Sequence, residues 1–154
     1  MTPPSRLTPG LGGTAGEYFV AAELSRRGYV ASITLRNARG IDILASDADA
    51  KRSVGIQVKT SQRSTKEWVL NKKAEQDIAE NLFYVFVSLN RDKGAEYHVV
   101  PRQIVSKSVR ESHATWLKTP GRRGKRHVDN PMRKFADRSG KTRIGGTFLD
   151  WMAR

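Results

Sequence analysis

The stretch GIDILASDADAKRSVGIQVKT, residues 40–60, contains two apolar runs on either side of a charged turn. The first run carries one acid, Asp42, and the second carries Gln57 and ends in Lys59. Two alternating apolar runs joined by a polar turn predict a β-hairpin. Burying an acid or a lysine in a strand costs free energy unless the group is paired or has a function, so these residues need an explanation.

Symmetry about the turn predicts the pairing of the two strands. If the turn is centred between Asp49 and Ala50, Asp42 lies opposite Gln57, and Lys59 is one diagonal step away. Because side chains alternate between the faces of a strand, all three polar groups then project from one face. The other face is apolar and is formed by Ile41, Ile43, Ala45, Val54, Ile56 and Val58.

A helix is expected before the hairpin, over AGEYFVAAELSRRGY, residues 15–29. Thr14 is its expected N-cap, with Glu17 completing a capping box, and Gly28 ends it. Glu17 shares a helical stripe with Val20 and Leu24, and such a stripe should face the sheet. Two acids, an amide and a lysine are therefore expected to converge where the helix crosses the hairpin.

The rest of the chain predicts a central sheet with a second helix. Further strands are expected at residues 30–37, 68–70, 82–89 and 96–100, and a helix at 102–118 after Pro101. Residues 119–139 are rich in Gly, Arg and Lys and are expected to form a loop, and 144–152 to close the domain by docking Phe148 and Trp151. This order of elements predicts an α/β or α+β fold with a central mixed sheet flanked by helices.

A length of 154 residues corresponds to one domain. The expected organisation is a flexible N-terminal arm over 1–13, the folded domain over 14–118, and a basic segment over 119–154 that packs on the same domain. The chain has no cysteine, which excludes disulfides and zinc–thiolate sites. It has neither a signal-peptide pattern nor a long apolar run, so a cytoplasmic protein without membrane contact is expected.

The charge is strongly positive and unevenly distributed. The formal net charge is +13, and residues 101–154 hold 14 of the 28 basic residues but only 4 of the 15 acidic ones. Such an excess predicts a polyanion partner, above all nucleic acid, with a solvated basic tail as the alternative. The candidate phosphate contacts are Arg122, Arg123, Lys125, Arg126, Arg133 and Lys134.

The polar set on the hairpin and helix suits metal-assisted phosphodiester hydrolysis. Carboxylate, amide and backbone oxygens bind Mg²⁺, and bound Mg²⁺ activates water and neutralises charge on a phosphate. Lys59 can orient the nucleophile or stabilise the developing negative charge. The structural alternatives remain open: Asp42 in an ion pair, and Glu17 as a capping-box acid only.

Glu17, the GID at 40–42 and the QVK at 57–59 together resemble the PD-(D/E)XK nuclease superfamily, and within it the branch with an acid on the first helix, which includes archaeal Holliday-junction resolvases. The resemblance implies a restriction-endonuclease-like core: a helix, a three-strand meander with the acidic hairpin, a crossover helix and a further strand. It implies Mg²⁺, replaceable by Mn²⁺, and cleavage of DNA. The implied catalytic residues are Glu17, Asp42, Gln57 and Lys59, and the implied metal ligands are Glu17, Asp42, Gln57 and Val58.

The resulting expectation is a Mg²⁺-dependent endodeoxyribonuclease that acts on branched or otherwise structured DNA. Gln57 stands where most members of the superfamily carry an acid, so a catalytically silent DNA-binding module is the alternative. An RNA-directed protein is a third hypothesis, but no RNA-binding signature supports it. One such site cuts one strand, which leaves a homodimer open, and the sequence does not determine the preferred DNA or the pathway.

Overall fold

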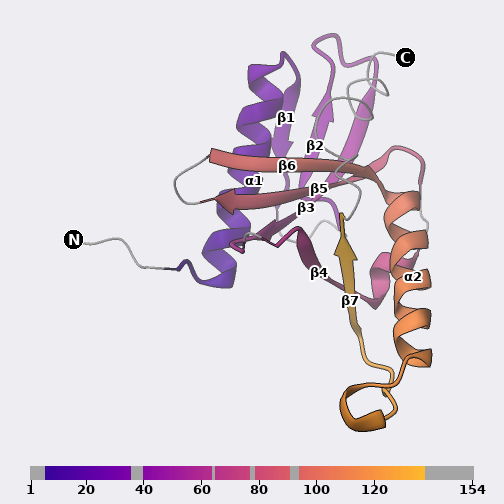
Figure 1. Cartoon of the computed structure of the whole chain (residues 1–154). Helices are drawn as coiled ribbons and strands as arrows, with labels where there is room; N and C mark the ends of the chain where they lie inside the picture. The colour runs from indigo at the N-terminus through magenta and orange to yellow at the C-terminus, as the bar shows by residue number, and fades with distance from the viewer. Residues whose placement is uncertain (1–5, 36–39, 64, 77–78, 91–93, 138–154) are drawn as a thin grey trace.

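The chain forms two long helices and a series of strands (Figure 1). A computed structural model describes residues 6–35, 40–63, 65–76, 79–90 and 94–137. The elements are α1 (Pro9–Arg26), β1 (Val30–Ile33), β2 (Ile43–Ser46), β3 (Ser53–Ser61), β4 (Glu67–Asn71), the 3₁₀ helix η1 (Lys72–Glu75), β5 (Leu82–Asn90), β6 (Gly94–Pro101), α2 (Arg102–Lys118), the 3₁₀ turn η2 (Arg122–Gly124) and β7 (Met132–Ala136).

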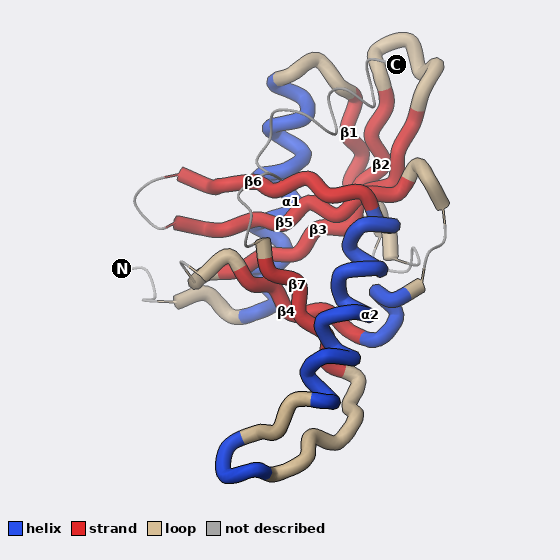
Figure 2. Tube along the Cα trace, turned by 45° about the vertical axis from the view of Figure 1, so that its right-hand side comes forward, coloured by secondary structure: helices blue, strands red, loops and turns tan. Residues whose placement is uncertain are grey.

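The main sheet has five strands in the order β1-β2-β3-β5-β6. Only β3 and β5 run parallel, and the other neighbours are antiparallel. A second, two-stranded sheet pairs β4 with β7 beside the main sheet (Figures 1 and 2). The predicted α/β fold with a central mixed sheet is confirmed.

The β2–β3 hairpin has the predicted register. Ile43 lies opposite Ile56, and Leu44 lies opposite Gly55, so the turn is centred where symmetry placed it. Ile43 and Ile56 are fully buried, whereas Leu44 on the other face is 49 % exposed. The period-2 pattern therefore assigned the faces correctly, because a slip by one residue would have exposed the whole apolar set.

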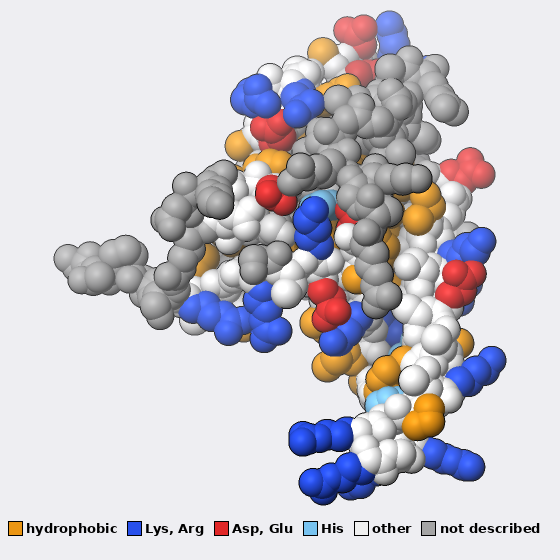
Figure 3. Space-filling model, viewed as in Figure 1, with side chains coloured by type: hydrophobic (Ala, Val, Ile, Leu, Met, Phe, Trp, Pro, Cys, Tyr) orange, Lys and Arg blue, Asp and Glu red, His pale blue; other side chains and the backbone are white. Residues whose placement is uncertain are grey.

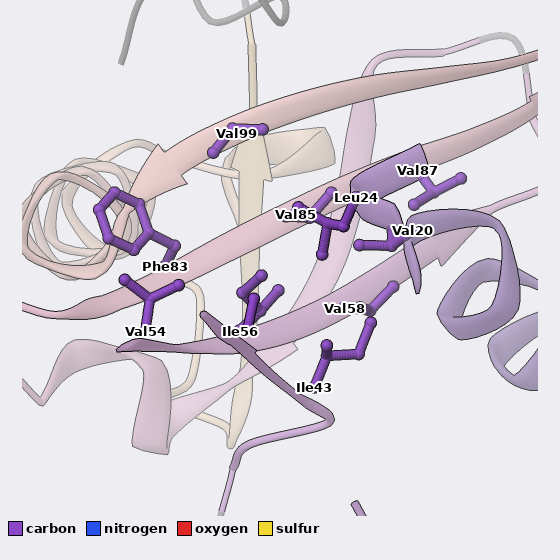
Figure 4. Packing of buried hydrophobic residues seen from close by; sticks show 11 residues of the cluster. Val20, Leu24, Ile43, Val54, Ile56, Val58, Phe83, Val85, Val87 and Val99 are labelled. Atoms are coloured by element: carbon purple, nitrogen blue, oxygen red, sulfur yellow. The ribbon is translucent and has the colours of Figure 1, made fainter. Parts of the chain in front are cut away.

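One face of the sheet is covered by α1. Val20 and Leu24 pack on a cluster from β2, β3, β5 and β6 that is aliphatic apart from Phe83 (Figure 4). The helix ends as predicted, with Gly28 at a φ of +89° just after it. The predicted start is wrong: the helix begins at Pro9, and Thr8 caps it by accepting the Leu11 N–H. Thr8 followed by Pro9 supplies an N-cap and a favourable N1 residue before Thr14, so residues 9–13 belong to the helix.

The opposite face is covered by α2 and the small sheet. Its cluster contains aromatic and aliphatic side chains from both sheets and α2, namely Trp68, Leu70, Ala74, Tyr84, Phe86, Val100, Val105, Val109 and Phe135. Trp68 is only 2 % exposed, and its indole N–H donates to the Val87 carbonyl at 3.0 Å. The bounds predicted for the second helix, residues 102–118, are confirmed.

Two expectations about the connections are wrong. Residues 132–136 form β7 rather than loop, because Arg133 and Phe135 alternate inward and the backbone pairs with β4. The chain passes from β3 to the parallel strand β5 through β4 and η1, where the resemblance implied a crossover helix. The expected docking of Phe148 and Trp151 lies outside the described residues. Neither helix in the described part of the chain is long and apolar enough to span a membrane.

Candidate active site

Asp42 lies where β2 and β3 separate. The β2–β3 ladder ends at the Ile43–Ile56 pair, while β3 continues alongside β5 as far as Ser61. The Asp42 N–H donates to the Ile56 carbonyl at 2.8 Å, and its Oδ2 accepts the Val58 N–H at 2.7 Å. The N–H and C=O of one strand residue point to the same edge, so the Val58 carbonyl also faces the Asp42 side of β3. A carboxylate and a backbone carbonyl thus adjoin at this fork.

Gln57 and Lys59 project from the face of β3 opposite α1. Gln57 is in register with Tyr84, and Lys59 with Phe86, both of which belong to the cluster under α2. Lys59 is half-buried and forms no ion pair with any residue in the described ranges. The predicted alternative, in which Asp42 pairs with Lys59 or an Arg, is not found among the described residues.

Glu17 approaches from the other layer. It is half-buried on α1 and follows Gly16, where the helix touches β3 so closely that an added Cβ would lie 1.9 Å from the Thr60 Oγ1. Because α1 begins at Pro9, Glu17 is too far along the helix to act as a capping-box acid. The structure brings Asp42 to the stretch of β3 that carries Gln57, Val58 and Lys59, and places Glu17 on the helix that packs on the other face of the sheet.

The oxygen atoms at the fork are of the kind that Mg²⁺ prefers. No group of three His, Asp or Glu side chains in the described ranges forms a metal site. Asp42 and the Val58 carbonyl supply hard oxygen donors, and Mg²⁺ commonly keeps several waters beside one or two carboxylates. Gln57 fits less well, because its Oε1 accepts a hydrogen bond from Arg102 Nη1 at 3.4 Å.

Arg102 and Tyr84 were missed as site residues. Arg102, the first residue of α2, is 6 % exposed, and its guanidinium carbon lies 5.4 Å from the centre of the Tyr84 ring. Burial raises the pKa of the Tyr84 hydroxyl; Arg102 opposes this shift and Asp42 adds to it. An arginine directly after a helix-starting proline was the only local signal, and it does not indicate what the side chain contacts.

The residues between α2 and β7, 119–131, form a projecting loop that we call the basic loop (Figure 2). Its exposed cations, Arg122, Arg123, Lys125 and Arg126, extend outward from the tip (Figure 3). Trp116 stacks between His127, with ring centres 4.0 Å apart, and His113, 5.2 Å apart. His113 Nε2 also bonds Asp129 Oδ1 at 2.8 Å and lowers the pKa of that carboxyl. The loop is anchored at its base, unlike a solvated tail.

Arg133 and Lys134, the other two predicted phosphate contacts, have structural roles, and so does Gln62. Arg133 is 3 % exposed, forms an ion pair with Glu75 and donates to two backbone carbonyls, so its guanidinium is engaged within the fold. Lys134 is exposed but pairs with Glu67 at 2.9 Å across the β4–β7 ladder. The Gln62 side chain bonds both the N–H and the carbonyl of Leu7, which ties the start of α1 to β3.

The fold is that of known nucleases. The chain is similar to the Holliday junction resolvase Hjc of Archaeoglobus fulgidus, with a TM-score of 0.54 and 15 % identity over 92 % of this chain and 96 % of that one. It is also similar to the bacterial homing endonuclease I-Ssp6803I, with a TM-score of 0.52 and 14 % identity over 90 % of this chain and 88 % of that one. No protein-family model and no curated protein matches the sequence. The likeness shows a nuclease fold of the Hjc type.

Proposed function

We propose that this protein is a metal-dependent endonuclease that hydrolyses DNA phosphodiester bonds. The observation that carries the proposal is the fork between β2 and β3, where the Asp42 carboxylate is held against Val58, and Lys59, without an ion pair among the described residues, follows on β3. This arrangement occurs in a fold that the chain shares with a Holliday junction resolvase and a homing endonuclease.

Each residue at the fork would have its own role in the reaction. Asp42 and the Val58 carbonyl would hold Mg²⁺ or Mn²⁺, with Glu17 and Gln57 as the remaining candidate ligands. When bound, the metal lowers the pKa of a coordinated water and neutralises charge on the phosphate. Lys59 would orient the attacking water or stabilise the negative charge that develops on the phosphate oxygens. Val58 keeps Asp42 in place by donating its N–H to the carboxylate at 2.7 Å.

The basic loop would bind the DNA at phosphates that lie outside the site of cleavage. Its four exposed cations contact phosphates without reading sequence. Branched or structured DNA is the proposed substrate, a homodimer would supply the second site for a paired cut, and a cytoplasmic location remains part of the proposal.

A second candidate function is a DNA-binding module that does not cut. Gln57 favours it, because the residue is neutral and its oxygen is engaged by Arg102. Such a module would keep the basic loop and the fold but lose the metal.

The test is cleavage of labelled duplex, single-stranded and four-way-junction DNA in Mg²⁺ and then in Mn²⁺. Asp42→Asn keeps the shape and removes the charge, so we expect cleavage to fall by about 10³-fold or more while DNA binding persists. Wild-type protein that binds these DNAs and cuts none of them would establish the second candidate. Ribonucleotide versions of the substrates separate an RNA-directed enzyme from both.

A further inference from the structure

The guanidinium of Arg102 is buried, and all its hydrogen-bond partners in the described part of the chain are neutral. Its Nε donates to the Gln76 carbonyl at 3.2 Å, its Nη2 to the Lys73 carbonyl at 3.3 Å, and its Nη1 to Gln57 Oε1 at 3.4 Å. A buried charge is ordinarily paired with an opposite charge, because desolvation is expensive. Among the described residues, no carboxylate forms an ion pair with Arg102.

The same cation lies close to the fork. Tyr84, under the guanidinium, is the β5 neighbour of Gln57, and both Arg102 and Asp42 influence the pKa of its hydroxyl. The guanidinium and the Asp42 carboxylate that Val58 holds therefore flank the same tyrosine, which is the β5 neighbour of Gln57.

We propose that Arg102 is a positioning residue of this site. It holds the Oε1 atom of Gln57, and for this reason a neutral side chain suits position 57. An acid at this position would pair with the buried guanidinium instead of serving as a metal ligand. The proposal rests on the proposed function in one respect only, namely that the fork binds a divalent cation.

This inference reverses the simple expectation for Gln57→Glu. If the position lacked only an acid, the substitution would restore a metal ligand and tighten metal binding. Next to Arg102, the new carboxylate forms a charge-assisted hydrogen bond that is stronger than the present bond to a neutral amide. The substitution should therefore stabilise the protein and leave metal affinity nearly unchanged.

The experiment is a double-mutant cycle on the full chain with two readouts. Wild type, Gln57→Glu, Arg102→Gln and the double variant are compared by thermal melting without metal and by Mn²⁺ binding followed by electron paramagnetic resonance. We expect Gln57→Glu to raise Tm by about 3–6 °C and to change the Mn²⁺ dissociation constant by less than about threefold. In the Arg102→Gln background, the same substitution should not raise Tm, and it should tighten Mn²⁺ binding by about tenfold or more.

Arg110 provides the matched control. It also lies on α2 and donates to a backbone carbonyl of η1, from Nη1 to the Glu75 oxygen at 3.2 Å, but it is exposed and makes no contact with Gln57. With Arg110→Gln, the substitution Gln57→Glu should behave as it does in the wild type. If Arg102→Gln does not fold, Arg102→Lys is the substitute, because lysine keeps the charge but has fewer N–H donors. In that background, Gln57→Glu should still give part of the rise in Tm.

The proposal is overturned if Gln57→Glu alone tightens Mn²⁺ binding tenfold, or if its effect on Tm is the same with and without Arg102. A protein that binds no Mn²⁺ in any of the four forms would contradict the proposed metal-dependent function. In that case the dependence of Tm on both residues still shows whether Arg102 holds position 57, so the two failures are distinguishable.

Discussion

The two layers that sandwich the main sheet differ in what they do with the same strand. Under α1, Val54, Ile56 and Val58 of β3 are aliphatic and buried, and α1 contributes Val20 and Leu24 to their cluster. Under α2, the odd-numbered residues Gln57 and Lys59 lie in a layer that also holds a buried arginine, a tyrosine and a fully buried His98. The α1 layer stabilises the fold, whereas the α2 layer carries the polar chemistry and extends into the basic loop.

The difference shows how one short strand can support both a core and a site. Because side chains alternate between the two faces of a strand, β3 can bury aliphatic residues on one face and present polar residues on the other. Asp42 belongs to neither set, because it lies just before β2. Its carboxylate accepts the Val58 N–H, which would otherwise bond a backbone carbonyl of a longer β2. The candidate site lies where the hairpin ladder stops, because the Val58 N–H is left there for a side chain.

Within the two layers, the largest effect is expected on the α2 side, at Lys59. Lys59→Met should lower the cleavage rate by about 10²–10³-fold, because the proposed function places this charge at the reacting phosphate. DNA affinity should change little, since at most one phosphate contact is lost. Single-turnover cleavage and a binding titration measure the two effects. Lys107→Met, an exposed residue on α2, is the control and should cut normally; wild-type rates for Lys59→Met would remove this lysine from the mechanism.

The basic loop should affect binding without affecting chemistry. Arg122→Gln/Lys125→Gln should weaken DNA binding by about tenfold and reduce the slope of log K against log salt by about 2, and removing all four cations should roughly double the change in slope. Rates at saturating DNA and the melting temperature should stay the same, since these side chains are exposed. Lys51→Gln/Lys107→Gln removes the same charge elsewhere; an equal loss of affinity there would mean that net charge alone binds the DNA.

In the α1 layer, the effects should be on stability. Gly16→Ala places a Cβ 1.9 Å from Thr60 Oγ1, and the resulting displacement should cost about 2 kcal/mol of unfolding free energy. Gly13→Ala on the same helix meets nothing within 4 Å and should instead stabilise by about 0.5–1 kcal/mol. Denaturant titration measures both. Equal effects of the two substitutions would show that α1 does not pack on β3 at Thr60.

The smallest effect concerns the outer surface of α1. Glu23 Oε1 accepts hydrogen bonds from Arg26 at 2.8 Å and Arg27 at 2.7 Å, and chiefly the bond from Arg26 lowers the pKa of Glu23 to about 2. A lowered pKa stabilises the fold above the ordinary value of 4.5, and this contribution is lost as the pH falls toward 2.

Glu23→Gln should therefore cost less than about 1 kcal/mol at pH 7, a shift in Tm of about 1–3 °C, because the arginines are solvent-exposed. The difference from wild type should shrink as the pH falls from 5 to about 2, which melting curves across this range would show. A difference that stays constant or grows at low pH would contradict the pairing. Asp49→Asn, in an exposed pair with Lys51 at 3.2 Å, is the charge-matched control.

Much of the fold was predictable because its signals are local. The hairpin register, the strands at 82–89 and 96–100 and the bounds of α2 all followed from periodicity, turns and a proline. The start of α1 and the strand β7 were not predicted. Thr14 looked like an adequate cap, and β7 depends on a partner strand more than sixty residues earlier in the chain.

By itself, the sequence determined which face of β3 carries Gln57 and Lys59, and it singled out Asp42, because alternation and turn symmetry are properties of neighbouring residues. Only the tertiary structure decided that α1 covers the other face, that Arg133 is buried against Glu75, and that Arg102 reaches Gln57 across 45 residues of sequence. Contacts between residues so far apart depend on how the layers pack, and no local pattern in the chain encodes that packing.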